Sequence, residues 1–191
     1  MHTLGRILGI GTAALAVIAL TACGSSDDSD DTTAATSPVQ STGAAASTAP
    51  AAKTGKECTA EDIGVTGDFG TAPKITIPDT CDPPTHLIVK DLSEGDGPAA
   101  ESGQQLTMNY ALVTWSDRQT LDSSFQRGEP FPLSLGAGQV IPGWDQGLIG
   151  VKEGSRRLLI VPPELGYGQG GNGVAPNETL VFVTDAVKVG N

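Results

Sequence analysis

The residues that could do chemistry in this chain gather between Gly138 and Gly171, and they are aromatic and apolar. Trp144, one of two tryptophans, follows Val140 and Ile141 in a Pro-Gly-Trp-Asp element, and Tyr167 stands in a glycine-rich loop. The stretch contains no histidine, no cysteine and no serine paired with a base. We therefore expect a shaped apolar pocket with few polar groups, and not a site for acid–base chemistry.

The surrounding pattern predicts the elements that must position this pocket. In Gln105–Val113, Leu106, Met108, Tyr110 and Leu112 alternate with smaller or polar residues, as in a strand with one buried face. A brief helix is expected at Trp144–Leu148, held by packing because its glycines disfavour helix. Other strand candidates are Thr85–Leu92, Pro130–Leu135, Arg156–Val161 and Thr179–Val189. The expected fold class is α+β, a twisted antiparallel sheet of about five strands wrapped on one short helix.

The composition limits the classes of partner. The chain has 191 residues and a formal net charge of −11. Nucleic acid is not expected as a partner, because phosphate backbones are bound through an excess of Lys and Arg. The glycine-rich stretch Gly166–Gly171 fits a nucleotide-loop pattern, but Pro176 follows it where that pattern requires a helix. We expect no cofactor and no metal.

The N-terminus has the pattern of an export signal. Met1–Cys23 carries Arg6, then an apolar run too short for a comfortable membrane span, and ends in Leu-Thr-Ala-Cys. This end resembles a bacterial lipobox, which predicts lipidation of Cys23; the alternative is an ordinary secretory signal with an incidental cysteine. Residues 24–56 lack apolar periodicity and are expected to be a disordered linker. These features predict an exported protein, lipid-anchored to the outer face of the cytoplasmic membrane.

Cys58 and Cys81 bound a short extension over residues 57–84, ahead of a main domain over 85–191. If Cys23 is lipidated, two thiols remain in an oxidising compartment, and a disulfide is expected. Metal binding is the rival interpretation, but four ligands are wanted and only His86 is near. One or two short strands are expected in the extension, added to the edge of the main sheet.

Five motifs in order make residues 85–189 resemble the FKBP-type peptidyl-prolyl cis-trans isomerases, the macrolide-binding immunophilin family. They are Asp122-Ser123-Ser124, Pro130-Phe131, Val140-Ile141-Pro142-Gly143-Trp144, Gly166-Tyr167-Gly168 and Thr179-Leu180-Val181-Phe182. The resemblance implies a proline isomerase for exported proteins. Its partners would be proline-containing polypeptides and macrolide inhibitors, with membrane contact through the lipid only, and we expect a monomer.

The resemblance also implies roles for individual residues. Trp144 would be the floor of a cup for a proline ring, with Asp122 and Tyr167 on its polar rim as the other catalytic residues. The Ile141 main-chain N–H would bind a ligand carbonyl. Leu121 replaces a usual aromatic, and the loop after Tyr167 is shorter than in the best-known members. The expected substrate-binding residues are Tyr110, Leu121, Phe131, Val140, Ile141, Val174 and Phe182.

Blander interpretations stay open at this point. Trp144, Phe131 and Phe182 could be ordinary core residues. Asp122 could only cap a turn, and Tyr167 could only cover the pocket. The same cup could also serve a binding or holding module without useful turnover, or the chain could be a structural envelope protein. Leu121 is the feature of the sequence on which the choice between enzyme and binding module depends.

Overall fold

The computed structural model describes residues 55–190. The predicted signal peptide, the lipidation site Cys23 and all but the last two residues of the predicted linker lie outside these residues. None of the helices in 55–190 is long and apolar enough to cross a membrane.

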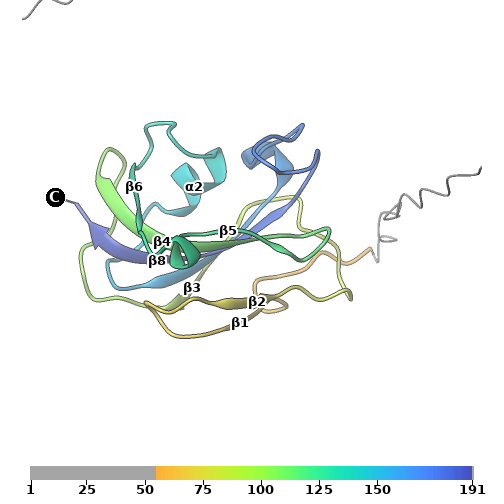
Figure 1. Ribbon diagram of the computed structural model, residues 1–191, viewed down its shortest axis with the longest axis horizontal. Coiled ribbons are helices and arrows are strands. Elements are labelled where there is room, and N and C mark those ends of the chain that lie inside the picture. Colours follow the sequence, from red (N-terminus) through yellow and green to blue (C-terminus); the bar gives the residue numbers. More distant parts are fainter. Residues whose placement is uncertain (1–54, 191) are drawn as a thin grey trace, which may run out of the picture. The chain divides into compact units, whose positions relative to one another are not determined.

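The centre of the fold is a six-stranded antiparallel sheet (Figure 1). The two longest strands, β4 (Gln105–Thr114) and β8 (Leu180–Val189), lie side by side in the middle. β7 (Arg156–Val161) and the edge strand β3 (Ile88–Ser93) continue the sheet beyond β8. On the other side, β4 pairs with both β5 (Thr120–Ser123) and β6 (Phe131–Ser134) at different points along its length. The predicted fold class is thus confirmed, with one strand more than the five expected.

One face of the sheet is covered by the short helix α2 (Pro142–Gly147). The helix can lie this close to β7 because it presents glycines to it: a Cβ on Gly143 would stand 2.4 Å from Val161 Cγ1. Proline at its first turn also suits the start of a helix, where no N–H bond is lost. The predicted common face of Leu106, Met108, Tyr110 and Leu112 is buried, and it packs with Trp144 of this helix. Ala111 and Val113 on the other face are buried too, so the expectation of a single buried face is wrong for the end of β4.

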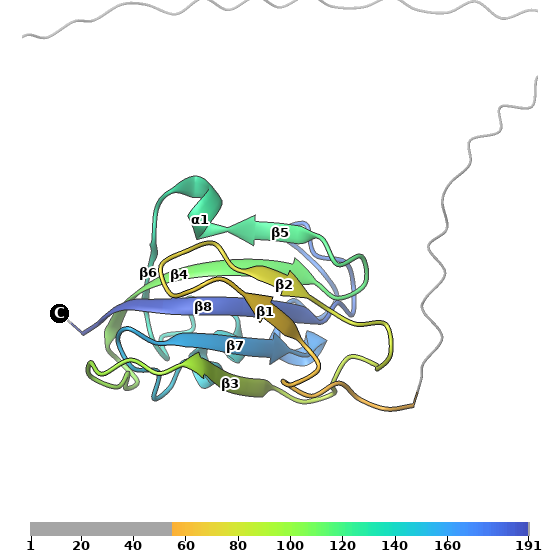
Figure 2. The same ribbon diagram turned by 90° about the horizontal axis from the view of Figure 1, so that it is seen from below.

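The opposite face of the sheet is covered by the cysteine-bounded extension, as Figure 2 shows from below. Its strands β1 (Gly64–Thr66) and β2 (Lys74–Thr76) pair only with each other. Ile63 and Ile77 pack with aliphatic side chains of β4, β7 and β8, among them Leu158 and Val183. The prediction that this segment extends the edge of the main sheet is therefore wrong. Strands of three residues can form few hydrogen bonds with a sheet edge. They bury more apolar surface when they lie across a face of the sheet.

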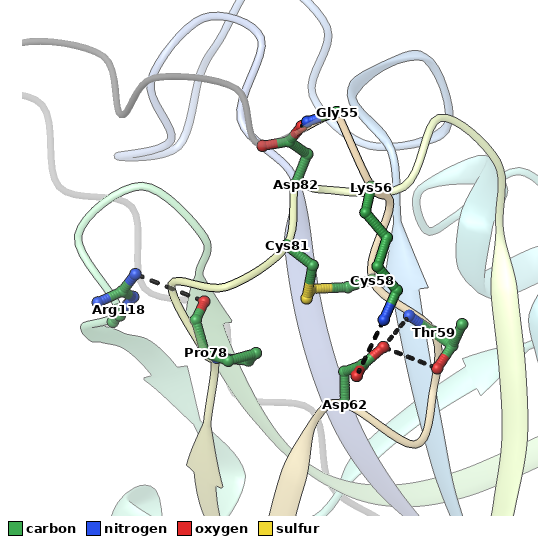
Figure 3. Close-up of a disulfide and its surroundings, with 9 residues drawn as sticks. All are labelled: Gly55, Lys56, Cys58, Thr59, Asp62, Pro78, Cys81, Asp82 and Arg118. Atoms are coloured by element: carbon green, nitrogen blue, oxygen red, sulfur yellow. Dashed lines mark hydrogen bonds and ion pairs between the residues drawn. A yellow bond between two sulfur atoms is a disulfide. The ribbon is translucent and has the colours of Figure 1, made fainter.

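The predicted disulfide is present between Cys58 and Cys81 (Figure 3). Both half-cystines are buried, and the chain ends around them are clamped by main-chain bonds from Cys58 N to Asp82 O and from Asp82 N to Lys56 O. Thr59 N and Oγ1 both donate to Asp62 Oδ2 and close the following turn. His86 Nδ1 lies 3.7 Å from Glu57 Oε2, and the two cysteine sulfurs are bonded to each other.

Two further short helical turns were not predicted. They are α1 (Ser124–Arg127), between β5 and β6, and the 3-10 turn η1 (Pro163–Leu165) after β7. α1 ends at Gly128, whose positive φ of 71° suits glycine. Asp122, two residues before α1, and Tyr167, two residues after η1, line the pocket described next.

Candidate active site

A cavity of about 230 Å³ opens between the sheet, α2 and the loop after η1. Its wall carries no histidine, cysteine or lysine, and all of the lining residues except Leu112 and Gln139 were predicted from the sequence. Val140 and Ile141 form the side next to the start of α2. The lining residues are Tyr110, Leu112, Asp122, Phe131, Gln139, Val140, Ile141, Trp144, Tyr167 and Phe182.

Four of the five aromatic residues that line the cavity form one cluster, with Trp144 at its centre. Tyr110, Phe131 and Phe182 all stand nearly perpendicular to the indole plane, at 89°, 82° and 76°, with ring centroids 5.2, 6.1 and 5.4 Å away. Edge-to-face pairs of this kind are favourable beyond the area they bury. The rings are brought together by register, because Phe131 lies opposite Met108 on β4 and Phe182 opposite Leu112. The pocket is therefore preformed by the sheet.

Trp144 is held by both ends of its short helix. It is 3% exposed; its main-chain N–H donates to Ile141 O, and Leu148 N donates to Trp144 O. Asp145, the next residue, accepts from the N–H groups of Gly136 and Gly138 at 2.8 and 3.0 Å. The carboxylate thereby fixes the loop that leads into Val140 and Ile141.

The main-chain N–H of Ile141 is a polar group left for a ligand. Among residues 55–190 it has no hydrogen-bond acceptor, whereas the Ile141 carbonyl accepts from Trp144 and Asp145. Ile141 lines the cavity and is only partly buried. A carbonyl entering the pocket would find this donor unpaired.

The polar side of the cavity is a three-residue network in which one member was missed by the sequence interpretation. The Tyr110 hydroxyl donates to Asp122 Oδ2, and Arg127 forms an ion pair with Asp122 Oδ1. Arg127 Nη2 also donates to the Tyr110 hydroxyl at 3.0 Å, with its guanidinium carbon 5.4 Å from the tyrosine ring centroid. Asp122 is thus tied to both neighbours, with its carboxylate facing the cavity.

This network shifts the proton affinity of Tyr110. Burial raises the pKa of the Tyr110 phenol above its ordinary value, and the hydrogen bond to Asp122 raises it further. The phenol therefore stays protonated and remains a donor to Asp122 at neutral pH. Arg127, whose pKa is raised mainly by its hydrogen bond to Tyr110, stays charged.

The serine that ends the Asp-Ser-Ser motif has a structural role. Ser124 is fully buried, and its hydroxyl accepts from Tyr110 N at 2.8 Å while donating to Asn109 Oδ1 at 2.9 Å. It connects the start of α1 to β4 beside the tyrosine. The motif therefore sets where Asp122 and Tyr110 meet.

Tyr167 comes from the loop after η1 and packs partly buried against the core. The loop is tied by main-chain bonds from Gly168 N to Pro163 O, from Gly170 N to Tyr167 O and from Asn177 N to Gly168 O. Such bonds fix the backbone that carries the phenol at the mouth of the cavity. No hydrogen bond of its hydroxyl occurs within residues 55–190.

Two of the expected substrate-binding residues do not line this cavity. Leu121 is 37% exposed beside it, close to Gly173, where a Cβ would stand 3.6 Å from Leu121 Cδ1. Val174 is buried in the core and pairs with Gly171 within the loop. Gln139 was missed because a polar side chain is not expected in an apolar wall. Its Oε1 accepts from Ser134 N, and this bond holds it against β6.

These features define what the pocket can do. It offers an aromatic floor, the unpaired Ile141 N–H, the Tyr167 phenol and the anchored Asp122 carboxylate. Its lining residues include no histidine, cysteine or lysine. Binding and orienting an uncharged ring with its adjacent carbonyls fits this arrangement, while hydrolysis or proton abstraction does not.

Comparisons with known proteins agree with this chemistry. The family model described as "FKBP-type peptidyl-prolyl cis-trans isomerase" matches residues 97–186. An FK506-binding protein of Streptomyces anulatus is 50% identical over 111 residues, which cover 56% of this chain and 90% of the relative. An FK506-binding protein of Neisseria meningitidis serogroup B is 44% identical over 106 residues, covering 54% and 95%.

Solved structures give the same result. The crystal structure of AtFKBP13 matches with a TM-score of 0.51 and 32% identity over 55% of this chain and 94% of that one. The crystal structure of FkpA from Escherichia coli matches with a TM-score of 0.51 and 37% identity over 56% and 49%. The chain therefore belongs to the FKBP-type peptidyl-prolyl cis-trans isomerase family, and its aromatic cavity stands where the sequence motifs of that family converge.

Proposed function

We propose that this isomerase acts on exported polypeptides outside the cytoplasmic membrane, to which a lipid on Cys23 anchors it. The observation that carries the proposal is the preformed aromatic cavity with its unpaired Ile141 N–H. The lipobox pattern of Met1–Cys23 and the Cys58–Cys81 disulfide, which persists in oxidising compartments, support the location.

The reaction is rotation about the bond that precedes proline. Its barrier arises from partial double-bond character, about 18–20 kcal/mol for a peptide bond. In the twisted transition state the carbonyl loses resonance charge, so an apolar cavity suits it better than the planar, more polar ground state, which prefers water. Only such differential binding accelerates the step, by a factor of ten for each ~1.4 kcal/mol.

Each site residue has a role in this scheme. Trp144 seats the proline ring between Tyr110, Phe131 and Phe182. The Ile141 N–H and the Tyr167 hydroxyl donate to substrate carbonyls and fix the chain on either side of the rotating bond. The Asp122 carboxylate, held by Arg127, orients the rotating carbonyl through its field. No proton is transferred.

We also propose that the cavity binds macrolides. The matched relatives from Streptomyces and Neisseria are named FK506-binding proteins, and the aromatic residues that line the cavity of this chain offer an apolar surface to a macrolide. A macrolide bound in the cavity would compete directly with proline-containing polypeptides.

A refolding assay limited by proline isomerisation tests the activity and the roles together. The wild-type chain should accelerate refolding, and FK506 should abolish the effect. Tyr167→Phe removes one hydrogen bond of about 0.5–1.5 kcal/mol, which predicts a loss of roughly two- to ten-fold in kcat/KM. Phe69→Ala, on the opposite side of the sheet, is the control and should leave the rate unchanged. Macrolide binding without acceleration would instead indicate a binding module.

The anchor needs a separate experiment. In a bacterial host, the wild-type chain should partition into the detergent phase and gain the mass of acyl chains, while Cys23→Ser should be released from membranes. Equal membrane association of both chains would exclude Cys23 as the anchor. That result would leave the isomerase activity untouched.

A further inference from the structure

The covered second face of the sheet contains a buried ion pair. Arg156 on β7 and Asp185 on β8 are register partners, and their side chains are 3% and 0% exposed. Arg156 Nε donates to Asp185 Oδ1 at 2.6 Å and Nη2 to Oδ2 at 2.8 Å. Burying such a pair is costly unless its remaining donors and acceptors are satisfied.

The turn that joins β1 to β2 satisfies them. Arg156 Nη1 and Nη2 donate to the main-chain oxygens of Gly67 and Thr71, and Gly70 N donates to Asp185 Oδ2 at 2.7 Å. All three partners in the extension are main-chain atoms of one turn. The ion pair is thus a docking site for that turn, on the face away from the proline pocket.

Few other interactions hold the rest of the extension in place. Of residues 57–84, six are in strands, and the buried apolar side chains are few: Cys58, Ala60, Ile63, Ile77, Cys81 and Pro84. Each ordered residue costs conformational entropy, so a segment of this length with so few buried contacts is favoured to open. The disulfide opposes opening because it restricts the released chain.

We propose that residues 57–84 are a disulfide-latched cover, which opens locally when Cys58–Cys81 is reduced while the proline pocket stays assembled. The family match begins at residue 97, so the cover is an addition to the matched domain. Opening would bare an aliphatic sheet face on the side of the sheet opposite the isomerase site. The face consists of Val113, Leu158, Ile160, Val181 and Val183.

The trigger is a thiol–disulfide exchange with a dithiol reductant. One thiolate of the dithiol attacks a cystine sulfur, which forms a mixed disulfide and frees the other cysteine. The second thiolate of the dithiol then attacks the dithiol sulfur of the mixed disulfide, which closes a cyclic disulfide and frees the remaining cysteine. The two electrons and two protons of the dithiol end on Cys58 and Cys81 as two thiols. No group of the proline pocket takes part.

Hydrogen exchange on the full chain carrying Cys23→Ser tests the latch. Treatment with dithiothreitol should speed exchange of the amides in β1 and β2 on the order of 100-fold. If the buried disulfide resists the reductant, adding Cys58→Ser and Cys81→Ser to the chain should have the same effect. Protection of β8 and the rate of prolyl isomerisation should change less than two-fold. Unchanged exchange in β1 and β2, or an equal rise in β8, would overturn the proposal.

A matched pair of glycine variants tests the docking turn. Gly70 and Gly103 both have positive φ (82° and 89°) and open space where a Cβ would go, so alanine strains both backbones alike. In the oxidised chain, Gly70→Ala should speed exchange in β1 and β2 at least ten-fold relative to β8, and Gly103→Ala should not. Equal patterns in the two variants would contradict docking by the ion pair.

Discussion

Gly143 in α2 approaches Val161 in β7 so closely that a Cβ would lie 2.4 Å from its Cγ1. The contact places Trp144 at the bottom of the pocket. Gly143→Ala should therefore force the helix off the sheet and destabilise the fold by about 1–3 kcal/mol, as overpacking does. Urea unfolding measures this. Gln146→Ala, on the exposed side of the same helix, should change stability little; similar losses in both would contradict the packing argument.

Arg127 should act on the reaction through Asp122 and Tyr110 and not by touching substrate. The ion pair is solvent-exposed, with about half of each side chain accessible, so its loss should cost at most about 1 kcal/mol. Arg127→Met is expected to lower kcat/KM two- to five-fold with little change in unfolding free energy. Arg118→Met, in the β4–β5 loop, is the control. A drop in stability that parallels the drop in rate would indicate a structural role instead.

The sequence predicted the pocket better than its surroundings. Alternation in Gln105–Val113 identified the buried face of β4, because a long strand repeats its pattern often enough to be recognised. Arg127 was not predicted, since its contact with Asp122 depends on how α1 turns between two strands. Only the placement of that short turn brings them together, and no local periodicity encodes it.

The second face shows a different limit. From Leu180 to Ala186, β8 is buried on both of its faces, because the extension covers one and α2 the other. The extension's strands have three residues each, too few to distinguish a sheet edge from a covering layer. Arg156 and Asp185 also resemble exposed charges in sequence, and only the turn docked on them explains their burial.

Activity and stability should both be flat between about pH 6 and 8. The pKa of Tyr110 is higher in the native state than its unfolded value of about 10. The native state therefore holds an extra proton between these two pKa values, and stability falls as the pH rises through that range, far above pH 8. The Thr114 hydroxyl lowers the pKa of Asp117, whose contribution is lost only as pH falls below about 4. Refolding rates at pH 6, 7 and 8 check this, and a bell-shaped profile would contradict it.

Leu121 should set which residue is accepted before proline. It lies exposed beside the cavity, next to Asp122 and close to the loop at Gly173, and presents a small apolar surface there. Leu121→Phe would enlarge that surface. A large apolar residue before proline would then bury roughly 40 Å² more apolar area, which should strengthen its binding by about 1 kcal/mol. We expect kcat/KM to rise about five-fold for Leu-Pro peptides and to stay constant for Gly-Pro peptides. An equal change for both would place Leu121 outside the contact with substrate and leave specificity to the loop after Tyr167.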